Sequence, residues 1–390
     1  MNFSEKMTVF PIDKFEGLQT PFYYYDMLLL EETLSTLRNE AQKYDFHIHY
    51  AIKANANDRI LHRICQYDFG VDCVSGYEME KALEVGFPAD GIFFAGVGKS
   101  DWEIELGLNH DIACFNVESL AELEVIHQLA EKVGRKAKVA FRINPNVRAN
   151  THHYITTGLD ENKFGIGLSE LEKVISRMQQ MKFIQFEGIH FHIGSQITEL
   201  DSFKELCLRI NELQDWFIAK HLFPKIINVG GGLGVDYEDP DSHPIPDFSA
   251  YFKIFKEFLE TKPGQEVHFE LGRSVVAQCG NLISRVLYVK EGAKKRFAIL
   301  DAGMTDLIRP ALYQAQHRID NISGFNGDKV RYDVVGPICE SSDCFGKALD
   351  LPEMKRGNIV AIRSAGAYGE VMVSNYNLRK TPDVYFSDTI

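Results

Sequence analysis

Short apolar segments alternate with amphipathic ones through most of this chain. Between them lie helix-like segments such as 119–134, where Ser119 can cap the first turn and Gly134 can end the helix. A further helix-like segment, 28–43, precedes the first apolar one. Strands that alternate with helices indicate a parallel sheet, and eight such units predict a (β/α)8 barrel of the TIM type. The apolar segments with the length and the Val, Ile, Phe and Tyr content of strands are 47–53, 70–75, 91–95, 112–117, 138–144, 186–193, 226–230 and 267–271.

The pattern changes after residue 280, where strand-like segments follow one another without long helices. This arrangement is typical of an antiparallel sheet or a small β-barrel, which the opening segment, with TVFPI and FYYYD around a turn, could join. We therefore expect a barrel domain over 26–275 and an all-β domain, a small β-barrel or sandwich, from 1–25 plus 276–390. The strand-like segments of the second domain are 282–289, 296–300, 330–335, 359–363 and 384–386.

Composition narrows the class of protein. The net charge of −13 disfavours binding to nucleic acid or anionic lipid. Seven cysteines without close paired spacing argue against a disulfide framework and against a zinc site, and favour a reducing cytoplasm. The opening MNFSEKMTVF lacks the features of a secretion signal, and no apolar run approaches the length of a membrane span. We expect a cytoplasmic enzyme for a small molecule, with no nucleic-acid or membrane partner.

Polar residues that suit catalysis follow several of the predicted strands. The carboxyl ends of barrel strands converge on one mouth, so residues distant in sequence would meet there. Lys53 in YAIKANAN follows the first strand. A lysine in this place is usually a solvated strand end. Surrounded by small residues and amides, however, it can be partly desolvated, and its neutral amine can form a Schiff base with a carbonyl group.

Two glycine-containing segments after the last two strands suit an anion. NVGGGLG, at 228–234, lets backbone N–H groups approach a phosphate, and Gly272 and Arg273 of FELGRS add an amide and a cation. Glu270 lies on the same strand face as Gly272 and could pair with Arg273 or with a protonated pyridine nitrogen. A lysine, a phosphate site and an acidic partner together are what pyridoxal phosphate requires.

Two histidines alternate along the sixth strand, in HFHIGSQ. His190 and His192 face one side and could ligate a metal ion, but no third ligand is near them in sequence. We therefore expect no metal, and we expect His192 to stack on the cofactor ring with Ser195 donating to its phosphate. From local sequence alone, we expect Cys339 and Tyr368 to be ordinary packing residues.

These motifs resemble those of the fold-type III pyridoxal-phosphate decarboxylases over essentially the whole chain. The family usually has EPGR where this chain has ELGR, so Leu271 replaces the family's proline. The resemblance is to members that act on diaminopimelate rather than ornithine, because Glu340 follows Cys339 where the ornithine enzymes carry aspartate. The motifs that make this distinction are THHYITTG (151–158), NKFGI (162–166), MTDLIRPALYQAQH (304–317), GPICESSD (336–343) and SAGAYG with SNYN.

The resemblance implies pyridoxal 5'-phosphate as cofactor and decarboxylation of meso-diaminopimelate to L-lysine, the last step of lysine biosynthesis. It implies Lys53 as the Schiff-base lysine, Cys339 as the proton donor and a homodimer in which Cys339 and Glu340 reach the partner's site. Arg273 and Arg309 would pair with the distal carboxylate of the substrate, and Glu340 would accept its distal ammonium. The implied cofactor ligands are Lys53, His192, Ser195, Gly232, Glu270, Gly272, Arg273 and Tyr368, and the implied substrate ligands are Arg273, Arg309, Tyr313, Glu340 and Tyr368.

Three other hypotheses remain open from the sequence. The chain could decarboxylate another substrate with a distal carboxylate, such as carboxynorspermidine. It could also be an inactive homologue that binds the cofactor, or a metal-dependent barrel hydrolase that uses His190 and His192.

Overall fold

The computed structural model describes residues 10–147, 163–323 and 328–390. The chain forms two compact units. The barrel unit comprises 34–234 and 247–272, and the β unit comprises 1–33, 235–246 and 273–390. Residues 26–33, 235–246 and 273–275, which were expected in the barrel domain, therefore group with the β unit.

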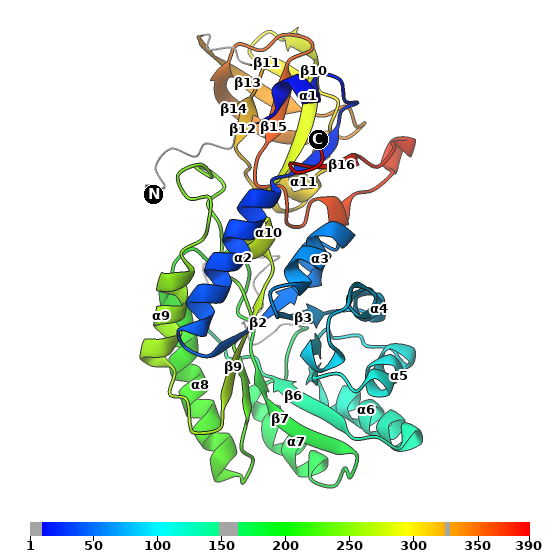
Figure 1. Ribbon diagram of the computed structural model, residues 1–390, viewed down its shortest axis with the longest axis vertical. Helices are drawn as coiled ribbons and strands as arrows, with labels where there is room; N and C mark the ends of the chain where they lie inside the picture. The colour runs from blue at the N-terminus through cyan, green and yellow to red at the C-terminus, as the bar shows by residue number, and fades with distance from the viewer. Residues whose placement is uncertain (1–9, 148–162, 324–327) are drawn as a thin grey trace. The chain divides into compact units, whose positions relative to one another are not determined.

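Eight parallel strands close the barrel in sequence order, and the last pairs with the first. The predicted barrel is confirmed, because each expected strand overlaps an observed one. Helices follow the strands and surround them (Figure 1). The strands are β2 (Phe46–Ala51), β3 (Gly70–Cys73), β4 (Ile92–Phe94), β5 (Cys114–Val117), β6 (Ala137–Arg142), β7 (Ile184–His190), β8 (Ile226–Asn228) and β9 (Glu266–Leu271). The helices are α2 (Met27–Gln42), α3 (Asp58–Cys65), α4 (Gly76–Val85), α5 (Asp101–His110), α6 (Leu120–Val133), α7 (Leu171–Met178), α8 (Asp201–Ala219) and α9 (Phe248–Phe258).

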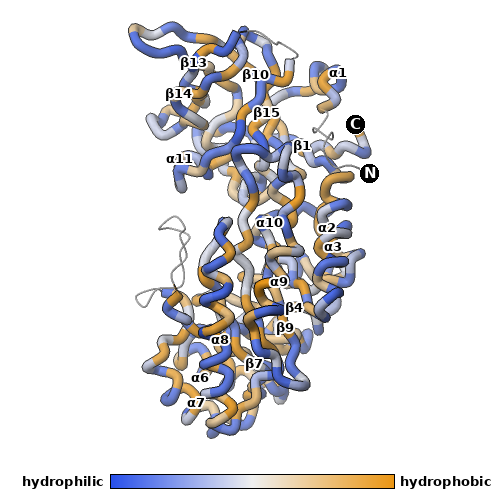
Figure 2. Tube along the Cα trace, turned by 90° about the vertical axis from the view of Figure 1, so that its left-hand side faces the viewer, coloured by the Kyte–Doolittle hydropathy of each residue, from blue (hydrophilic) through white to orange (hydrophobic). Residues whose placement is uncertain are grey.

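Local sequence explains where these helices begin and what they bury. The Ser119 hydroxyl accepts a hydrogen bond from the backbone N–H of Glu122 at the start of α6, and Gly134 ends that helix at φ 74°. Hydrophobic and hydrophilic residues alternate along α8 (Figure 2). Its buried face includes Phe203, Leu206 and Ile210, and each such burial stabilises the fold by about 1.5–3 kcal/mol.

The β unit is built on an eight-stranded sheet with the path β12-β15-β10-β11-β13-β14. Strand β1 pairs antiparallel with β10 and parallel with β16, so FYYY of the opening segment joins this sheet. The all-β prediction is confirmed, although β12 and β14 were not expected. Of TVFPI, residues 8 and 9 lie outside the described residues, and Ile12 begins α1 (Ile12–Phe15). The strands are β1 (Phe22–Tyr25), β10 (Gly280–Glu291), β11 (Arg296–Leu300), β12 (Ile319–Asn321), β13 (Lys329–Val335), β14 (Cys344–Pro352), β15 (Ile359–Ile362) and β16 (Asp383–Phe386).

The two unexpected strands lack the signals of a buried strand. β12 has only three residues, and β14 is mostly half-buried or exposed and contains Gly346 and Lys347. Within the described ranges, no helix combines the length and the apolar character that crossing a bilayer requires.

Candidate active site

Glu270 is the centre of a buried polar cluster at the carboxyl ends of the barrel strands. Its Oε1 accepts hydrogen bonds from Nδ2 of Asn228 at 2.7 Å and from Nδ2 of Asn116 at 3.2 Å. Its Oε2 lies 3.0 Å from Nε2 of His190. These partners come from β8, β5 and β7, so closure of the barrel brings together residues more than forty positions apart.

This environment keeps Glu270 ionised. Burial alone would raise the pKa of the carboxyl group, but the opposing influence of His190, followed by that of Lys53, holds the pKa well below its usual value. A buried anion with fixed donors on both oxygens is a strong acceptor for a protonated ring nitrogen.

Lys53 lies directly after β2, in the short 3-10 helix Ile52–Ala54. Its Nζ is 2.9 Å from Oδ2 of Asp72, whose side chain is fully buried on β3, whereas the lysine side chain is 38% exposed. Burial raises the pKa of Asp72, as does the charge of Glu270. The amine is therefore held at the mouth by a carboxylate and remains partly accessible.

The glycines after β8 form a loop that has no room for side chains. A Cβ on Gly231 would lie 1.9 Å from the carbonyl oxygen of Glu270, and one on Gly232 would lie 2.7 Å from that of Gly194. Gly232 also has φ 112°, which L-residues with side chains rarely adopt. The backbone of this loop is therefore packed too closely for side chains, and a glycine turn of this kind is what an anion cradle requires.

His192 and Ser195 lie in the turn after β7. The backbone N–H of Gly231 points at Nδ1 of His192 at 3.4 Å. Burial, and then the charge of Arg142, lower the pKa of His192 well below its usual value, so the ring is neutral at physiological pH. Ser195 is half-buried in the same turn. A neutral flat ring beside a glycine loop is suited to stacking on an aromatic cofactor.

Gly272 is also required by close packing. A Cβ there would lie 2.9 Å from the Cβ of Ala54 and 3.1 Å from that of Ala51. The lysine, the anionic Glu270, the neutral His192 and the glycine loop together fit pyridoxal 5'-phosphate.

The β unit contains a second cluster, in which two buried arginines converge on Tyr237. The phenol oxygen of Tyr237 accepts hydrogen bonds from Nη1 of Arg273 at 2.6 Å and from Nη1 of Arg309 at 2.9 Å. Burial would raise the pKa of Tyr237, but the two guanidinium groups outweigh it and lower the pKa. The ring of Tyr368 lies 4.8 Å from the guanidinium carbon of Arg273. Arg273 begins α10 (Arg273–Val276), and Arg309 begins α11 (Arg309–Tyr313), which Tyr313 ends.

His317 fixes the orientation of Arg309. Its Nδ1 lies 2.8 Å from the carbonyl oxygen of Arg363, so Nδ1 carries the hydrogen and Nε2 accepts from Nη1 of Arg309 at 2.9 Å. The Nε of Arg309 is buried and has no hydrogen-bond partner among the residues that the structure describes. A buried guanidinium with a free N–H favours an anionic ligand.

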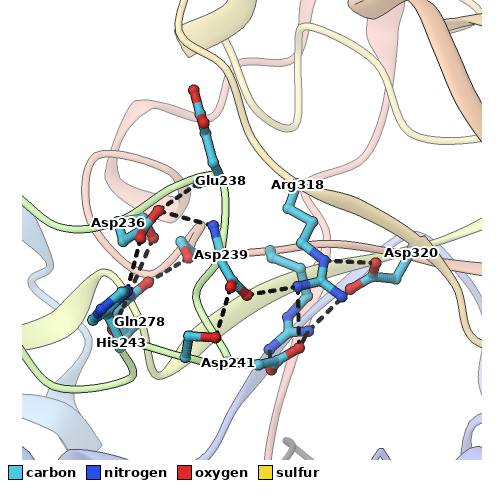
Figure 3. A network of polar contacts seen from close by, with 11 residues as sticks. Asp236, Glu238, Asp239, Asp241, His243, Gln278, Arg318 and Asp320 are labelled. Atoms are coloured by element: carbon cyan, nitrogen blue, oxygen red, sulfur yellow. Dashed lines mark hydrogen bonds and ion pairs between the residues drawn. The ribbon is translucent and has the colours of Figure 1, made fainter.

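A polar network holds the segment that carries Tyr237 (Figure 3). Oδ1 of Asp236 accepts from the backbone N–H groups of Glu238 and Asp239, and Arg318 pairs with Asp239 at 3.2 Å and with Asp241 at 3.3 Å. The backbone N–H of Arg318 also donates to the carbonyl oxygen of Tyr237 at 3.1 Å. Tyr237 is therefore anchored from both sides within the β unit.

Cys339 and Glu340 lie in the turn after β13, and both are exposed. The expectation from local sequence that Cys339 is a buried packing residue is therefore wrong, because the turn leaves its side chain at the surface. The backbone N–H of Cys339 donates to Oδ1 of Asn377 at 3.2 Å, and Oε1 of Glu340 accepts from the Tyr376 hydroxyl at 2.8 Å. The neighbouring Leu378 is 96% exposed.

Several of the residues in these clusters were not expected from the sequence. Asp72, Asn116 and Asn228 each lie at or next to the end of an otherwise apolar strand, the same signal that identified Lys53. Tyr237 and His317 carry no such signal, because only tertiary contacts bring them to the arginines. The motif at 151–158 lies outside the described residues, as does residue 162 of NKFGI.

Comparison with known proteins identifies relatives over nearly the whole chain. Residues 29–277 match the family described as "Pyridoxal-dependent decarboxylase, pyridoxal binding domain". A diaminopimelate decarboxylase of Bacteroides thetaiotaomicron is 58% identical over 383 residues, which cover 98% of this chain and 99% of that protein. The crystal structure of diaminopimelate decarboxylase from Helicobacter pylori complexed with L-lysine has a TM-score of 0.91 and 39% identity, and covers 97% of this chain and 94% of that one. This chain therefore belongs to the pyridoxal-dependent decarboxylase family.

Proposed function

We propose that this enzyme decarboxylates meso-2,6-diaminopimelate to L-lysine and carbon dioxide with pyridoxal 5'-phosphate as cofactor. Its relatives support this reaction, since a protein 58% identical to it is named diaminopimelate decarboxylase. Within the chain, the observation that carries the proposal is the convergence of two buried arginines on the phenol oxygen of Tyr237. A substrate with a second carboxylate supplies the negative charge that such a pair of cations favours.

The barrel unit supplies the cofactor site in this proposal. When bound, the cofactor supplies an electron sink for the electron pair left behind by carbon dioxide. Lys53 would hold it covalently, and the anionic Glu270 would accept a hydrogen bond from its ring nitrogen and favour the protonated form of that nitrogen. His192 would stack on the ring. Ser195, Gly232 and Gly272 would complete the binding of the cofactor. Arg273 and Tyr368, which the proposal also assigns to the cofactor, belong to the β unit.

The β unit supplies substrate recognition. Arg309 and Arg273 bind the distal carboxylate, with Tyr313 and Tyr368 beside it, and Glu340 accepts the distal ammonium. Ornithine has no distal carboxylate and would leave the arginines buried without an anion, which penalises its binding.

We further propose that the enzyme is a cytoplasmic homodimer in which Cys339 and Glu340 serve the partner's site. Both residues are exposed and lie next to the exposed side chains of Tyr376 and Leu378, which a second copy would cover. Cys339 would then donate the proton that replaces carbon dioxide. All seven cysteines are free thiols, as a reducing compartment allows.

An assay of the purified enzyme tests the reaction directly. With meso-diaminopimelate and the cofactor, it should release lysine and carbon dioxide in equal amounts. Borohydride should fix the cofactor to the peptide that contains Lys53, and Lys53→Ala should lose at least 10³-fold in kcat, on the order expected when a covalent catalyst is removed. Lys43→Ala, an exposed lysine on the surface, is the matched control. Normal turnover by Lys53→Ala would remove the mechanism.

The same assay separates the other hypotheses. Faster release of carbon dioxide from carboxynorspermidine would reassign the substrate. A failure of both compounds in a single-turnover experiment would indicate an inactive homologue. A hydrolase that uses His190 and His192 requires a bound metal for activity, whereas the structure pairs His190 with Glu270.

A further inference from the structure

The barrel carries a second group of histidines and a carboxylate at the amino-terminal ends of its strands. His47 on β2 and His268 on β9 are register partners, and their rings stack with centroids 4.8 Å apart at 19°. Glu266 precedes His268 by two residues on β9 and therefore shares its face of the strand. One ligand atom from each of the three residues lies within 4.8 Å of the others. We propose that His47, Glu266 and His268 bind a divalent transition-metal ion such as zinc.

The hydrogen bonds behind this group determine which nitrogen of His268 faces it. Nδ1 of His49 lies 3.2 Å from the carbonyl oxygen of Gly91, which can only accept. In the neutral ring, Nδ1 of His49 therefore carries the hydrogen, and Nε2 is an acceptor. Nε2 of His49 is 2.8 Å from Nδ1 of His268, so that nitrogen of His268 must be the donor.

The hydrogen bonds from Gly91 through His49 to His268 leave a lone pair on Nε2 of His268, and this lone pair points at Glu266. The distance from Nε2 to Oε2 of Glu266 is 3.3 Å, so two acceptors face each other. A cation between them resolves this conflict. A proton shared between His268 and Glu266 would also resolve the conflict, but it would leave the third potential ligand, His47, without a role. A metal ion, in contrast, binds all three converging ligand atoms.

The donor set and its surroundings suit zinc. Two imidazoles and one carboxylate with a free position for water are a common catalytic or accessible zinc arrangement, with Zn–N distances of about 2.0–2.1 Å. The contact from His268 to His49 and on to Gly91 is the kind of outer hydrogen bond that orients a histidine ligand. His47 and Glu266 are exposed, so rotation of their side chains can draw the ligands together. A depression of about 700 Å³ borders all three residues and admits the ion from solvent.

This position separates the site from decarboxylation and gives it a structural effect. Glu266 and Glu270 lie four residues apart on one strand, which corresponds to about 13 Å at about 3.3 Å per residue. β2 and β9 are the first and last strands of the barrel, so a metal held by His47 and His268 links the two strands that close it. The ion should therefore stabilise the folded barrel by binding it in preference to the unfolded chain.

Cobalt is a suitable probe because its visible spectrum reports on coordination. The holoenzyme, with any purification tag removed, is titrated with Co²⁺, and the bound Co²⁺ is then displaced with Zn²⁺. We expect one equivalent per chain, and we expect His47→Ala and Glu266→Gln each to weaken binding at least tenfold. Zinc should raise the Tm of the wild type more than that of either variant. His62→Ala is the matched control, because His62 is an exposed histidine on α3 whose Nδ1 pairs with the carbonyl oxygen of Asp58.

The outcomes are distinct from those of the decarboxylase assay. His47 and Glu266 are exposed, so their variants should fold, and the circular dichroism spectrum checks this. His47→Gln is the second variant if His47→Ala does not fold. Equal cobalt affinity in the wild type and in folded His47 and Glu266 variants would overturn the site, and so would the lack of saturable binding at one equivalent. Decarboxylation without added metal should be the same in all of these proteins.

Discussion

Replacing Arg309 by methionine tests whether the buried arginine pair recognises the distal carboxylate of the substrate. Methionine keeps much of the length and apolar volume of the side chain and removes the charge. The change leaves Nη1 of Arg273 on the Tyr237 hydroxyl but removes the donor to Nε2 of His317. A buried acceptor left without its partner costs about 1–3 kcal/mol in the free energy of unfolding.

The expected effect on catalysis follows from the free N–H groups of Arg309. Within the described part of the chain Nε has no partner, and Nη1 serves both Tyr237 and His317, so a carboxylate can bind side-on through Nε and Nη2. Each hydrogen bond to a charged group contributes about 1.5–3 kcal/mol, so the loss of two should cost at least about 3 kcal/mol. At about 1.4 kcal/mol for each factor of ten, kcat/KM for diaminopimelate should fall by roughly 10²-fold or more.

The assay is steady-state release of carbon dioxide over a range of diaminopimelate concentrations, with urea unfolding to verify that the variant is folded. Arg331→Met is the matched control, because Arg331 is an exposed arginine of the same unit that pairs with Asp350 on the surface. A kcat/KM for Arg309→Met within threefold of the wild type would refute the assignment and move recognition of the carboxylate elsewhere.

Three further predictions follow from the buried polar groups. Tyr237→Phe removes the acceptor shared by Arg273 and Arg309, and should raise KM and lower the free energy of unfolding by about 1–3 kcal/mol; unchanged values of both would contradict the shared role. Glu270→Gln removes the anion that keeps the cofactor nitrogen protonated and should lower kcat by roughly 10²-fold or more in a carbon dioxide assay, whereas a loss below threefold would speak against it. Burial, followed by the charge of Arg309, lowers the pKa of His317 from 6.5 to about 3, so between these values the unfolded chain binds a proton that the folded chain does not. Stability should therefore fall as the pH drops from about 6.5 toward 3, and His317→Gln should reduce this slope in urea unfolding at several pH values; an unaltered slope would rule His317 out as its source.

The sequence predicted the order of strands and helices because strand and helix periodicities are local properties. Closure of eight parallel strands then required that Lys53, at the end of β2, and Glu270, at the end of β9, face one mouth. The glycine-rich NVGGGLG was readable for a similar reason, since glycines at such a turn indicate close backbone approach. These expectations depend on chain geometry over a few residues and on one general rule of barrel topology.

The tertiary structure alone decided which side chains meet. Asn116 and Asn228 bond to Glu270 because their strands occupy particular places around a closed ring, and strand periodicity does not give that spacing. Tyr237 joins Arg273 and Arg309 because segment 235–246 packs with the β unit, although it lies between two barrel elements in sequence. Pairings of this kind depend on contacts between residues far apart in the chain, whose energies appear only once the backbone is folded. Local sequence therefore determined the scaffold and the ends of its strands, and long-range packing determined the partners of the charged groups.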